Sequence, residues 1–271
     1  MTTTTFKLRD ASLVSDRRLR RIMGLPVWEA LPAPEVPYRL SDPFILVHEA
    51  SLQTSQIANM DTEHPHRGFD NLWYIVKGST STGHSTGPDG AMERARLPEG
   101  SLLHLRAGRG VRHAEGVGAD QLRDGLDGGE VRTVLFWVNL ARKDKASEPW
   151  AVVLQPEDIA LSQEGDATAR VLVGEGSPVQ LGTPALILDV ALARGGRTTH
   201  YVPAEFQGFA YLLDGAASFG ANRMRAEAGQ LVIMGPGETF VVEDALPGTR
   251  YLLMAGKPFG EEPRFNGPFV D

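Results

Sequence analysis

The chain of 271 residues contains no cysteine. Disulfide bridges, thiolate metal ligands and a cysteine nucleophile are therefore excluded, and the absence is consistent with a cytoplasmic protein. Apolar runs are all short, so we expect neither a membrane span nor a signal peptide. Positive charge is also scarce, because 27 lysines and arginines are set against 34 acidic residues, which gives a formal net charge of −7. A general nucleic-acid binder needs a basic face, so we do not expect that class of protein.

Helical patterns are equally scarce. Only two short segments, Ser15–Ile22 and Pro156–Leu161, have apolar residues spaced in a way that favours a helix. The rest of the chain consists of short apolar runs, such as FILVHEA, LWYIVKG and TRYLLMAG, which are rich in β-branched and aromatic residues. The 30 glycines and 18 prolines separate these runs. Many short strands between turn residues predict an all-β fold of the sandwich or barrel type.

The two halves of the chain resemble each other. His64 precedes the sequence WYIVKG, and His200 precedes the similar sequence AYLLDG about half a chain length later. We therefore predict two β-barrels in tandem, an N-terminal domain of residues 1–145 and a C-terminal domain of residues 146–271. The polar segment Ala141–Pro149 is the expected linker. A single extended sandwich is the alternative architecture.

The histidines are distributed unevenly, since six of the seven precede residue 114. His64-Pro65-His66 and His113-Ala114-Glu115 each place two metal-binding groups two residues apart. Residues two apart in a β-strand point to the same face, so each pair can direct both groups into one cavity. A single histidine is more often an ordinary core or surface residue. Three imidazoles and a carboxylate in register instead suit a divalent first-row metal.

Several motifs carry a resemblance to a known family. HPHRGFD, the turn LPEGS and the later His113 resemble the general cupin pattern, although His113 comes a couple of residues late, after an inserted Gly-Arg-Gly. HPHRGFD, YIVKG, AGRGVRHAE and WVNLARKDK together resemble the pirin family of bicupins, and LMAGKPFGE and GPFV near the C-terminus are also similar to it. One departure is Asp70, where pirins commonly have glutamate, and this is not a ligand position. The resemblance implies two cupin, jelly-roll-like barrels.

The resemblance also implies a metal site. In pirins the corresponding residues bind one metal ion, usually iron, and in this chain they are His64, His66, His113 and Glu115. The family favours Fe(II), whereas the donor types alone also admit Mn, Co, Ni, Cu or Zn. One metal per chain is therefore expected, bound by the N-terminal barrel.

Four histidines lie outside the two pairs: His48, His84, His104 and His200. We expect His48 to be packed in a strand and His84 to lie on a hairpin loop. His104 is the one rival to His113, because many cupins place a ligand near the LPEGS turn, but its spacing from Glu115 and the family pattern favour His113. In the second half, Val202 stands at the position that matches His66. The C-terminal barrel is therefore expected to lack a metal.

The resemblance implies an activity as well. Bacterial pirins resemble quercetin 2,3-dioxygenases, so the first hypothesis is a dioxygenase that opens flavonols such as quercetin with O2 and releases carbon monoxide. Glu115 would be the general base that removes the proton of the substrate hydroxyl. Phe69, Trp73 and Phe136 are candidates for the apolar wall of the substrate pocket, with an ordinary core position as the alternative. Arg67 and Arg109 receive no assigned role.

Two other classes of function stay open at this stage. In a regulatory pirin the iron would shape a surface that binds a transcription factor or a metabolic enzyme, without chemistry. A metal-dependent isomerase or another small-molecule cupin enzyme is the third class, because barrels of this type host many reactions. Turnover separates the first class from the second, and a pocket lined by charged groups would favour the third.

Overall fold

The computed structural model of the chain describes residues 6–57, 60, 62–87, 89–116 and 129–271. These residues are mostly β-strand, which confirms the predicted all-β class. Their two α-helices, α1 (Tyr38–Ser41) and α2 (Thr54–Ile57), have four residues each, and η1 (Arg142–Asp144) and η2 (Pro156–Asp158) are single 3-10 turns. No helix in this described part of the chain is long and apolar enough to cross a membrane.

The chain forms two compact units, and each is assembled from segments that are not contiguous. The N-terminal barrel comprises residues 19–29, 44–158 and 261–271, and the C-terminal barrel comprises residues 1–18, 30–43 and 159–260. The chain thus passes from the N-terminal to the C-terminal barrel between residues 158 and 159, which is later than the expected boundary between residues 145 and 146. The segment Ala141–Pro149 stays inside the N-terminal barrel because the strand that follows it pairs within that barrel.

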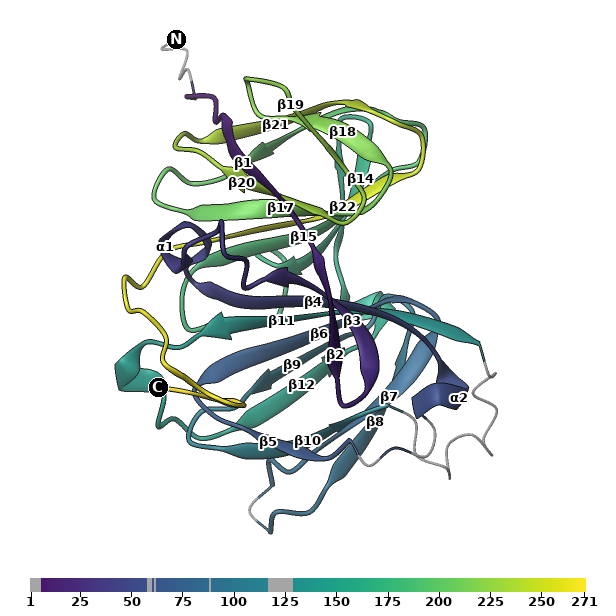
Figure 1. Cartoon of the computed structure of the whole chain (residues 1–271), viewed down its shortest axis with the longest axis vertical. Coiled ribbons are helices and arrows are strands. Elements are labelled where there is room, and N and C mark those ends of the chain that lie inside the picture. The colour runs from purple at the N-terminus through teal and green to yellow at the C-terminus, as the bar shows by residue number, and fades with distance from the viewer. Residues whose placement is uncertain (1–5, 58–59, 61, 88, 117–128) are drawn as a thin grey trace. The chain divides into compact units, whose positions relative to one another are not determined.

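The N-terminal barrel has a seven-stranded sheet in the order β12-β9-β6-β11-β4-β3-β2 and a four-stranded sheet in the order β5-β10-β7-β8. The strands of the large sheet are β2 (Arg18–Ile22), β3 (Leu25–Leu31), β4 (Phe44–Gln53), β6 (Phe69–Lys77), β9 (Leu102–Arg106), β11 (Glu130–Asn139) and β12 (Trp150–Leu154). Those of the small sheet are β5 (His64–His66), β7 (Ser79–His84), β8 (Glu93–Pro98) and β10 (Val111–Glu115). The C-terminal segment adds the short hairpin of β23 (Phe265–Asn266) and β24 (Phe269–Val270). Figure 1 shows the small sheet facing the large one, and apolar side chains of both sheets share one core.

The C-terminal barrel repeats this arrangement with a seven-stranded sheet in the order β1-β20-β17-β22-β15-β14-β13 and a four-stranded sheet in the order β16-β21-β18-β19. The strands of its large sheet are β1 (Ala11–Asp16), β13 (Leu161–Glu164), β14 (Ala167–Val173), β15 (Ala185–Leu192), β17 (Gln207–Asp214), β20 (Gln230–Met234) and β22 (Thr249–Gly256). Those of its small sheet are β16 (Gly196–Tyr201), β18 (Ala216–Phe219), β19 (Met224–Glu227) and β21 (Thr239–Ala245). The strand orders match position by position, as a duplicated barrel requires.

The segment Ser15–Ile22 is not a helix, contrary to the expectation from its spacing. It forms the end of β1 and the whole of β2, and β2 continues into β3 through a two-residue turn at Met23 and Gly24. Both turn residues have positive φ, 51° and 83°, as a type I′ hairpin requires. Leu19 and Ile22 are three residues apart, which imitates a helical pattern, but pairing with β3 at the edge of the sheet decides the conformation.

The two barrels differ in how their interiors are filled. Thr133 of β11 pairs with Ile75 of β6, and Tyr251 of β22 pairs with Leu212 of β17. The sequence repeat aligns Ile75 with Leu212, so Thr133 and Tyr251 occupy equivalent positions. The Tyr251 ring is fully buried and packs edge-on against Phe219 at 5.7 Å. Tyr251 therefore occupies the space that the smaller Thr133 leaves open in the N-terminal barrel.

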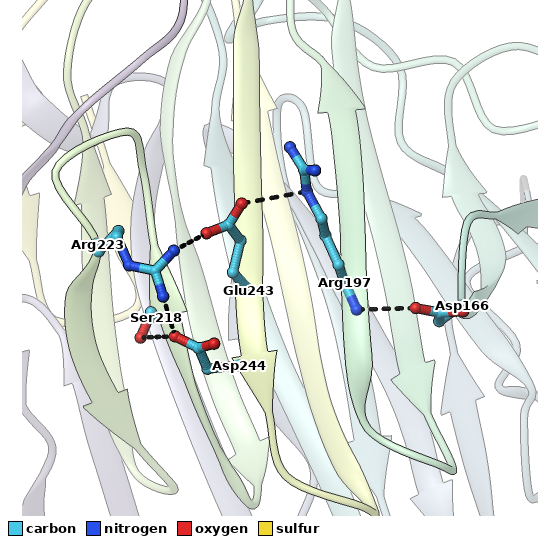
Figure 2. Close-up of polar contacts among 6 residues, drawn as sticks. All are labelled: Asp166, Arg197, Ser218, Arg223, Glu243 and Asp244. Carbon is cyan, nitrogen blue, oxygen red and sulfur yellow. Dashed lines mark hydrogen bonds and ion pairs between the residues drawn. The ribbon is translucent and has the colours of Figure 1, made fainter.

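The C-terminal barrel also carries a surface network of charged residues on its small sheet (Figure 2). Glu243 of β21 pairs with Arg223 and with Arg197, whose Nε lies 3.2 Å from Glu243 Oε1. Arg223 also pairs with Asp244, and the Arg197 amide donates to Asp166 at 3.0 Å. The two arginine side chains are more than half exposed, so solvent screens these ion pairs and each adds little stability. We assign this network to the surface and not to a site.

Candidate metal centre and adjoining cavity

Three histidines converge between β5 and β10. The register of the two strands sets His64 directly opposite His113, while His66 follows on the same face of β5. His113 Nε2 lies 2.9 Å from His64 Nε2, which lies 3.2 Å from His66 Nε2. Two nitrogens bound at right angles to one ion, at about 2.1 Å each, would be about 3 Å apart. The spacing of the three ring nitrogens therefore fits a shared metal ion, and a ligand atom from each residue lies within 4.8 Å of the others.

Backbone carbonyls orient two of the rings. His64 Nδ1 lies 2.6 Å from the Thr62 carbonyl oxygen, and His66 Nδ1 lies 3.4 Å from that of Pro268. A carbonyl can only accept, so these contacts place the proton on Nδ1 and leave the Nε2 lone pair available. These two rings thus present Nε2 lone pairs toward one point, where the Nε2 of His113 also lies, and this is the arrangement that a metal needs.

The buried histidines of the centre are held in their neutral form. Burial, with a smaller effect of His64, lowers the pKa of His66 to about 3. Burial also lowers the pKa of His113 well below its ordinary value, and the neighbouring imidazoles lower it further. Neutral imidazole is the form that binds metals, so these two ligands need lose no proton at neutral pH.

Glu115 lies at the edge of this cluster. It is the last residue of β10, on the same face as His113, and its Oε1 is 3.9 Å from His113 Nε2. Within the described residues this oxygen is buried without a hydrogen-bond partner. Burial raises the pKa of the Glu115 carboxyl, against a smaller opposing effect of His64. The carboxylate can therefore turn to a metal or act as a base, and Glu115 is not one of the three convergent ligands.

The loop after β5 is held by the C-terminal segment. The Val270 amide donates to the Arg67 carbonyl at 2.9 Å, and Lys145 Nζ donates to the carbonyls of Gly68 and Val270 at 2.8 and 3.2 Å. A Cβ at Gly68 would lie 1.8 Å from the Val270 carbonyl oxygen, so only glycine fits there. Burial lowers the pKa of Lys145 to about 8. These contacts fix the segment that supplies the Pro268 carbonyl to His66.

A cavity opens beside the three histidines within the N-terminal barrel. The space free of protein atoms is about 790 Å³, a volume that includes the opening to solvent. Its walls are mainly apolar, and the polar side chains that reach it are few. The lining residues are Ile22, Met23, Leu25, Val27, His48, Ala50, Leu52, Ile57, Thr62, His64, Trp73, Thr80, Glu115, Gly116, Val131, Thr133 and Leu135.

The three aromatic residues expected at the pocket have different positions. Trp73 lines the cavity. Phe69 lies deeper, stacked on Trp137 with ring centroids 4.0 Å apart and 5.0 Å from the His66 ring, so it supports the metal centre. Phe136 is buried on the opposite face of β11, because Thr133 and Leu135 of the same strand point into the cavity and side chains alternate.

One wall of the cavity was not among the residues expected from the sequence. Ile22, Met23, Leu25 and Val27 reach it from the β2–β3 hairpin. Leu25 and Val27 follow the alternation of a strand, and Gly24 suits a turn with positive φ, but Met23 is not a typical residue for the first turn position, so the local signal for this hairpin is weak. Its pairing with β4 is a long-range contact that a local pattern does not reveal.

Two family models match the chain. A pirin model covers residues 27–138, and a model of the pirin C-terminal cupin domain covers residues 187–271. Pirin-1 of Arabidopsis thaliana is 32% identical over 244 residues, which span 87% of this chain and 79% of that protein. The chain belongs to the pirin family.

Solved structures share the fold of this pirin. A quercetin 2,3-dioxygenase from Acinetobacter baumannii aligns over 97% of this chain and 92% of its own, with a TM-score of 0.82 and 24% identity. The bacterial pirin YhhW from Escherichia coli, solved in complex with nickel(II), aligns over 94% and 99%, with a TM-score of 0.66 and 15% identity. At these identities the likeness shows the fold alone, and it confirms two tandem cupin barrels.

The other histidines of this pirin lie outside the cluster. His84 was expected on a hairpin loop, but it is the last residue of β7. There it is buried and pairs in register with His113. His48 lies in β4, as expected, and lines the cavity. In the C-terminal barrel, His200 Nε2 lies 2.6 Å from the Tyr251 hydroxyl, and the described residues of this barrel form no cluster of three metal-ligating side chains.

His104 is committed to a buried ion-pair network. Its Nε2 lies 3.3 Å from Asp70 Oδ1, and neither side chain is exposed. Arg106 donates two hydrogen bonds to the same carboxylate, at 2.8 and 2.9 Å, and stacks over Trp150. Burial disfavours the Asp70 carboxylate, but Arg106 and His104 outweigh this effect and hold the pKa of Asp70 below its usual value.

Replacing Asp70 by asparagine in this pirin is expected to lower the free energy of unfolding by about 3–5 kcal/mol, because the ion pair at the buried Asp70 would be broken and the partly buried Arg106 would lose its counter-charge. Urea denaturation measures this change. Because the pKa of Asp70 is lower in the folded state, its stabilisation is complete above about pH 4 and is lost as the pH falls through the folded-state pKa. The difference between the wild type and Asp70→Asn should therefore narrow in acid.

The matched control for this prediction is Glu130→Gln. Glu130 accepts from Lys77 at 2.8 Å in an exposed ion pair on the same sheet, so its removal should change stability little. Equal effects of the two substitutions would contradict a structural role for the Asp70 network.

Proposed function

We propose that this protein is an Fe(II)-dependent dioxygenase that opens flavonols such as quercetin and releases carbon monoxide. The observation that carries the proposal is the convergence of three histidine Nε2 atoms beside an apolar cavity that also contains Glu115. Apolar walls with few polar groups suit a flat aromatic substrate and do not favour a charged one. The fold shared with a quercetin 2,3-dioxygenase supports the same reaction class.

His64, His66 and His113 would hold the metal, with Glu115 beside them. The ion would supply Lewis acidity toward the 3-hydroxyl of the flavonol and a redox-active partner for O2. Glu115 would take the proton of that hydroxyl, and its raised pKa makes it a stronger base than an exposed carboxylate. Trp73 and Leu135 would pack against the aromatic rings and exclude water from the reacting carbons.

The reaction balances without an external reductant. The two atoms of O2 end on the ring carbons that flank the 3-hydroxyl carbon, and the two carbon–carbon bonds to that carbon break. The carbon leaves as carbon monoxide with its original oxygen, and the rest of the flavonol becomes an ester that carries a carboxylic acid. One O2 consumed per carbon monoxide released is therefore the expected stoichiometry.

The test is turnover by the iron-loaded protein. We expect O2 uptake and carbon monoxide release in equal amounts on addition of quercetin, measured with an oxygen electrode and by gas analysis, and no uptake by the metal-free protein. Iron-loaded protein that binds iron but consumes no O2 would reject the dioxygenase and favour a regulatory pirin that binds a protein partner. Nickel-, manganese- and cobalt-loaded protein in the same assay tests the choice of metal.

A further inference from the structure

A chain of three polar side chains reaches the cavity from the outer edge of the large sheet. Arg20 of β2 lies with its Nε 3.0 Å from Glu29 Oε1 of β3, and Glu29 Oε2 lies 3.5 Å from His48 Nε2 of β4. Arg20 is about half exposed, whereas the side chains of Glu29 and His48 are 12% and 11% exposed. Of these three side chains, His48 is the one that lines the cavity.

His48 stands apart from the metal centre on the cavity wall. The strand register places Trp73, Leu135 and His48 in one row across β6, β11 and β4. Neighbouring strands are about 4.8 Å apart, so Trp73 and His48 are separated by about 10 Å. His66 packs against Phe69 of β6 and Trp137 of β11. A two- or three-ring aromatic molecule that reaches the metal can therefore extend along this row to His48.

The position of Glu29 indicates which nitrogen of the His48 imidazole is available as a hydrogen-bond acceptor. The contact with His48 lowers the pKa of Glu29, burial opposes this, and Arg20 lowers it further, so Glu29 is a carboxylate. A carboxylate 3.5 Å from Nε2 favours the tautomer with the ring proton on that nitrogen. The other nitrogen, Nδ1, then carries a lone pair. An acceptor on a mainly apolar wall discriminates between ligands that do and do not bring a donor to that point.

We propose that His48, positioned by Glu29, determines substrate specificity by accepting a hydrogen bond from a hydroxyl on the part of the aromatic substrate remote from the metal. The substrate class is thus a polyhydroxylated aromatic molecule and not its unsubstituted analogue. The inference about turnover rests on the proposed dioxygenase activity, whereas the inference about binding does not.

A comparison of two flavonols distinguishes the effect of the remote hydroxyls from the effect of the oxygens that would bind the metal. Quercetin carries hydroxyls on its outer rings, and 3-hydroxyflavone has only the hydroxyl next to its carbonyl. Binding to the iron-loaded protein without O2 is measured by quenching of tryptophan fluorescence, since Trp73 lines the cavity. The His48→Leu substitution should weaken quercetin binding about tenfold and leave 3-hydroxyflavone binding within about twofold. With O2, KM for quercetin should rise while kcat changes little.

Companion variants distinguish a specific contact from a packing effect. His48→Gln keeps an acceptor and should retain most of the preference for quercetin, while Glu29→Gln should reduce it by a smaller factor than His48→Leu. Ser51→Leu, on the opposite face of β4, is the matched control and should leave the binding of both flavonols unchanged. Thermal unfolding of each variant verifies that it is folded.

The outcomes are distinct for the two proposals. Equal weakening of both flavonols by His48→Leu, an unchanged affinity for quercetin, or no binding of either flavonol by the wild type would overturn the role of His48. A tenfold selective loss of quercetin binding without carbon monoxide release by the wild type would support His48 as a specificity residue and reject the dioxygenase.

Discussion

Replacing His64 and His113 together by alanine is expected to abolish stoichiometric metal binding. The double variant keeps only His66 of the three nitrogens that converge within 4.8 Å. Mutation of a residue that only hydrogen-bonds to a metal ligand typically lowers the affinity for the metal by about 10–100-fold. The loss of two direct ligands should therefore weaken metal binding by more than about a thousandfold. Elemental analysis after dialysis should show about one ion per wild-type chain and almost none in the variant.

The control for this experiment is His48→Leu, which removes an imidazole from the same cavity but not from the convergent cluster. It should keep the wild-type metal content. Near-stoichiometric metal in the double variant would show that the ion binds elsewhere and would remove the basis for the metal centre.

Replacing Glu115 by glutamine is expected to lower kcat by about 10²–10⁴-fold while the metal is retained. The amide has the same shape but cannot accept the substrate proton, and general-base catalysis contributes about this factor. Three histidine ligands stay in place, so iron content should be unchanged. Stopped-flow absorbance of the flavonol with parallel metal analysis measures both quantities.

The result of Glu115→Gln separates two roles of the carboxylate. Loss of the metal together with activity would identify Glu115 as a required ligand and leave no support for a separate base. Unchanged kcat would contradict both roles. Glu63→Gln is the control, because Glu63 is a carboxylate next to His64 that pairs with Arg112 near the surface, away from the cavity.

Local periodicity accounts for the part of the site that the sequence predicts. His64 and His66 are two residues apart in a strand, as are His113 and Glu115, and the period of two brings each pair to one face. The prediction needed no knowledge of which strands pair. The antiparallel register that sets His64 against His113 then completes the cluster.

Some features of the site could not be predicted from the sequence. They depend on contacts between distant strands or on which face of a strand is turned to the cavity. His104 is fixed by Asp70, a residue on another strand, so no local signal excluded it as a ligand. Phe136 belongs to a strand with apolar residues on both faces, and a shift of one residue exchanges the faces. The hairpin at Met23 and Gly24 covers a cavity built mainly from much later residues, so its role appears only in the folded chain.

The equivalence of Thr133 and Tyr251 has a consequence for how such proteins diversify. The N-terminal barrel has a cavity lined by Thr133, and in the C-terminal barrel the Tyr251 ring is packed into the core at the equivalent position. A change at that position can create or erase a chamber without altering strand order, register or the histidines at its end. A substitution at this one position is therefore a way for one barrel to gain or lose space for a ligand while the other barrel keeps its packing.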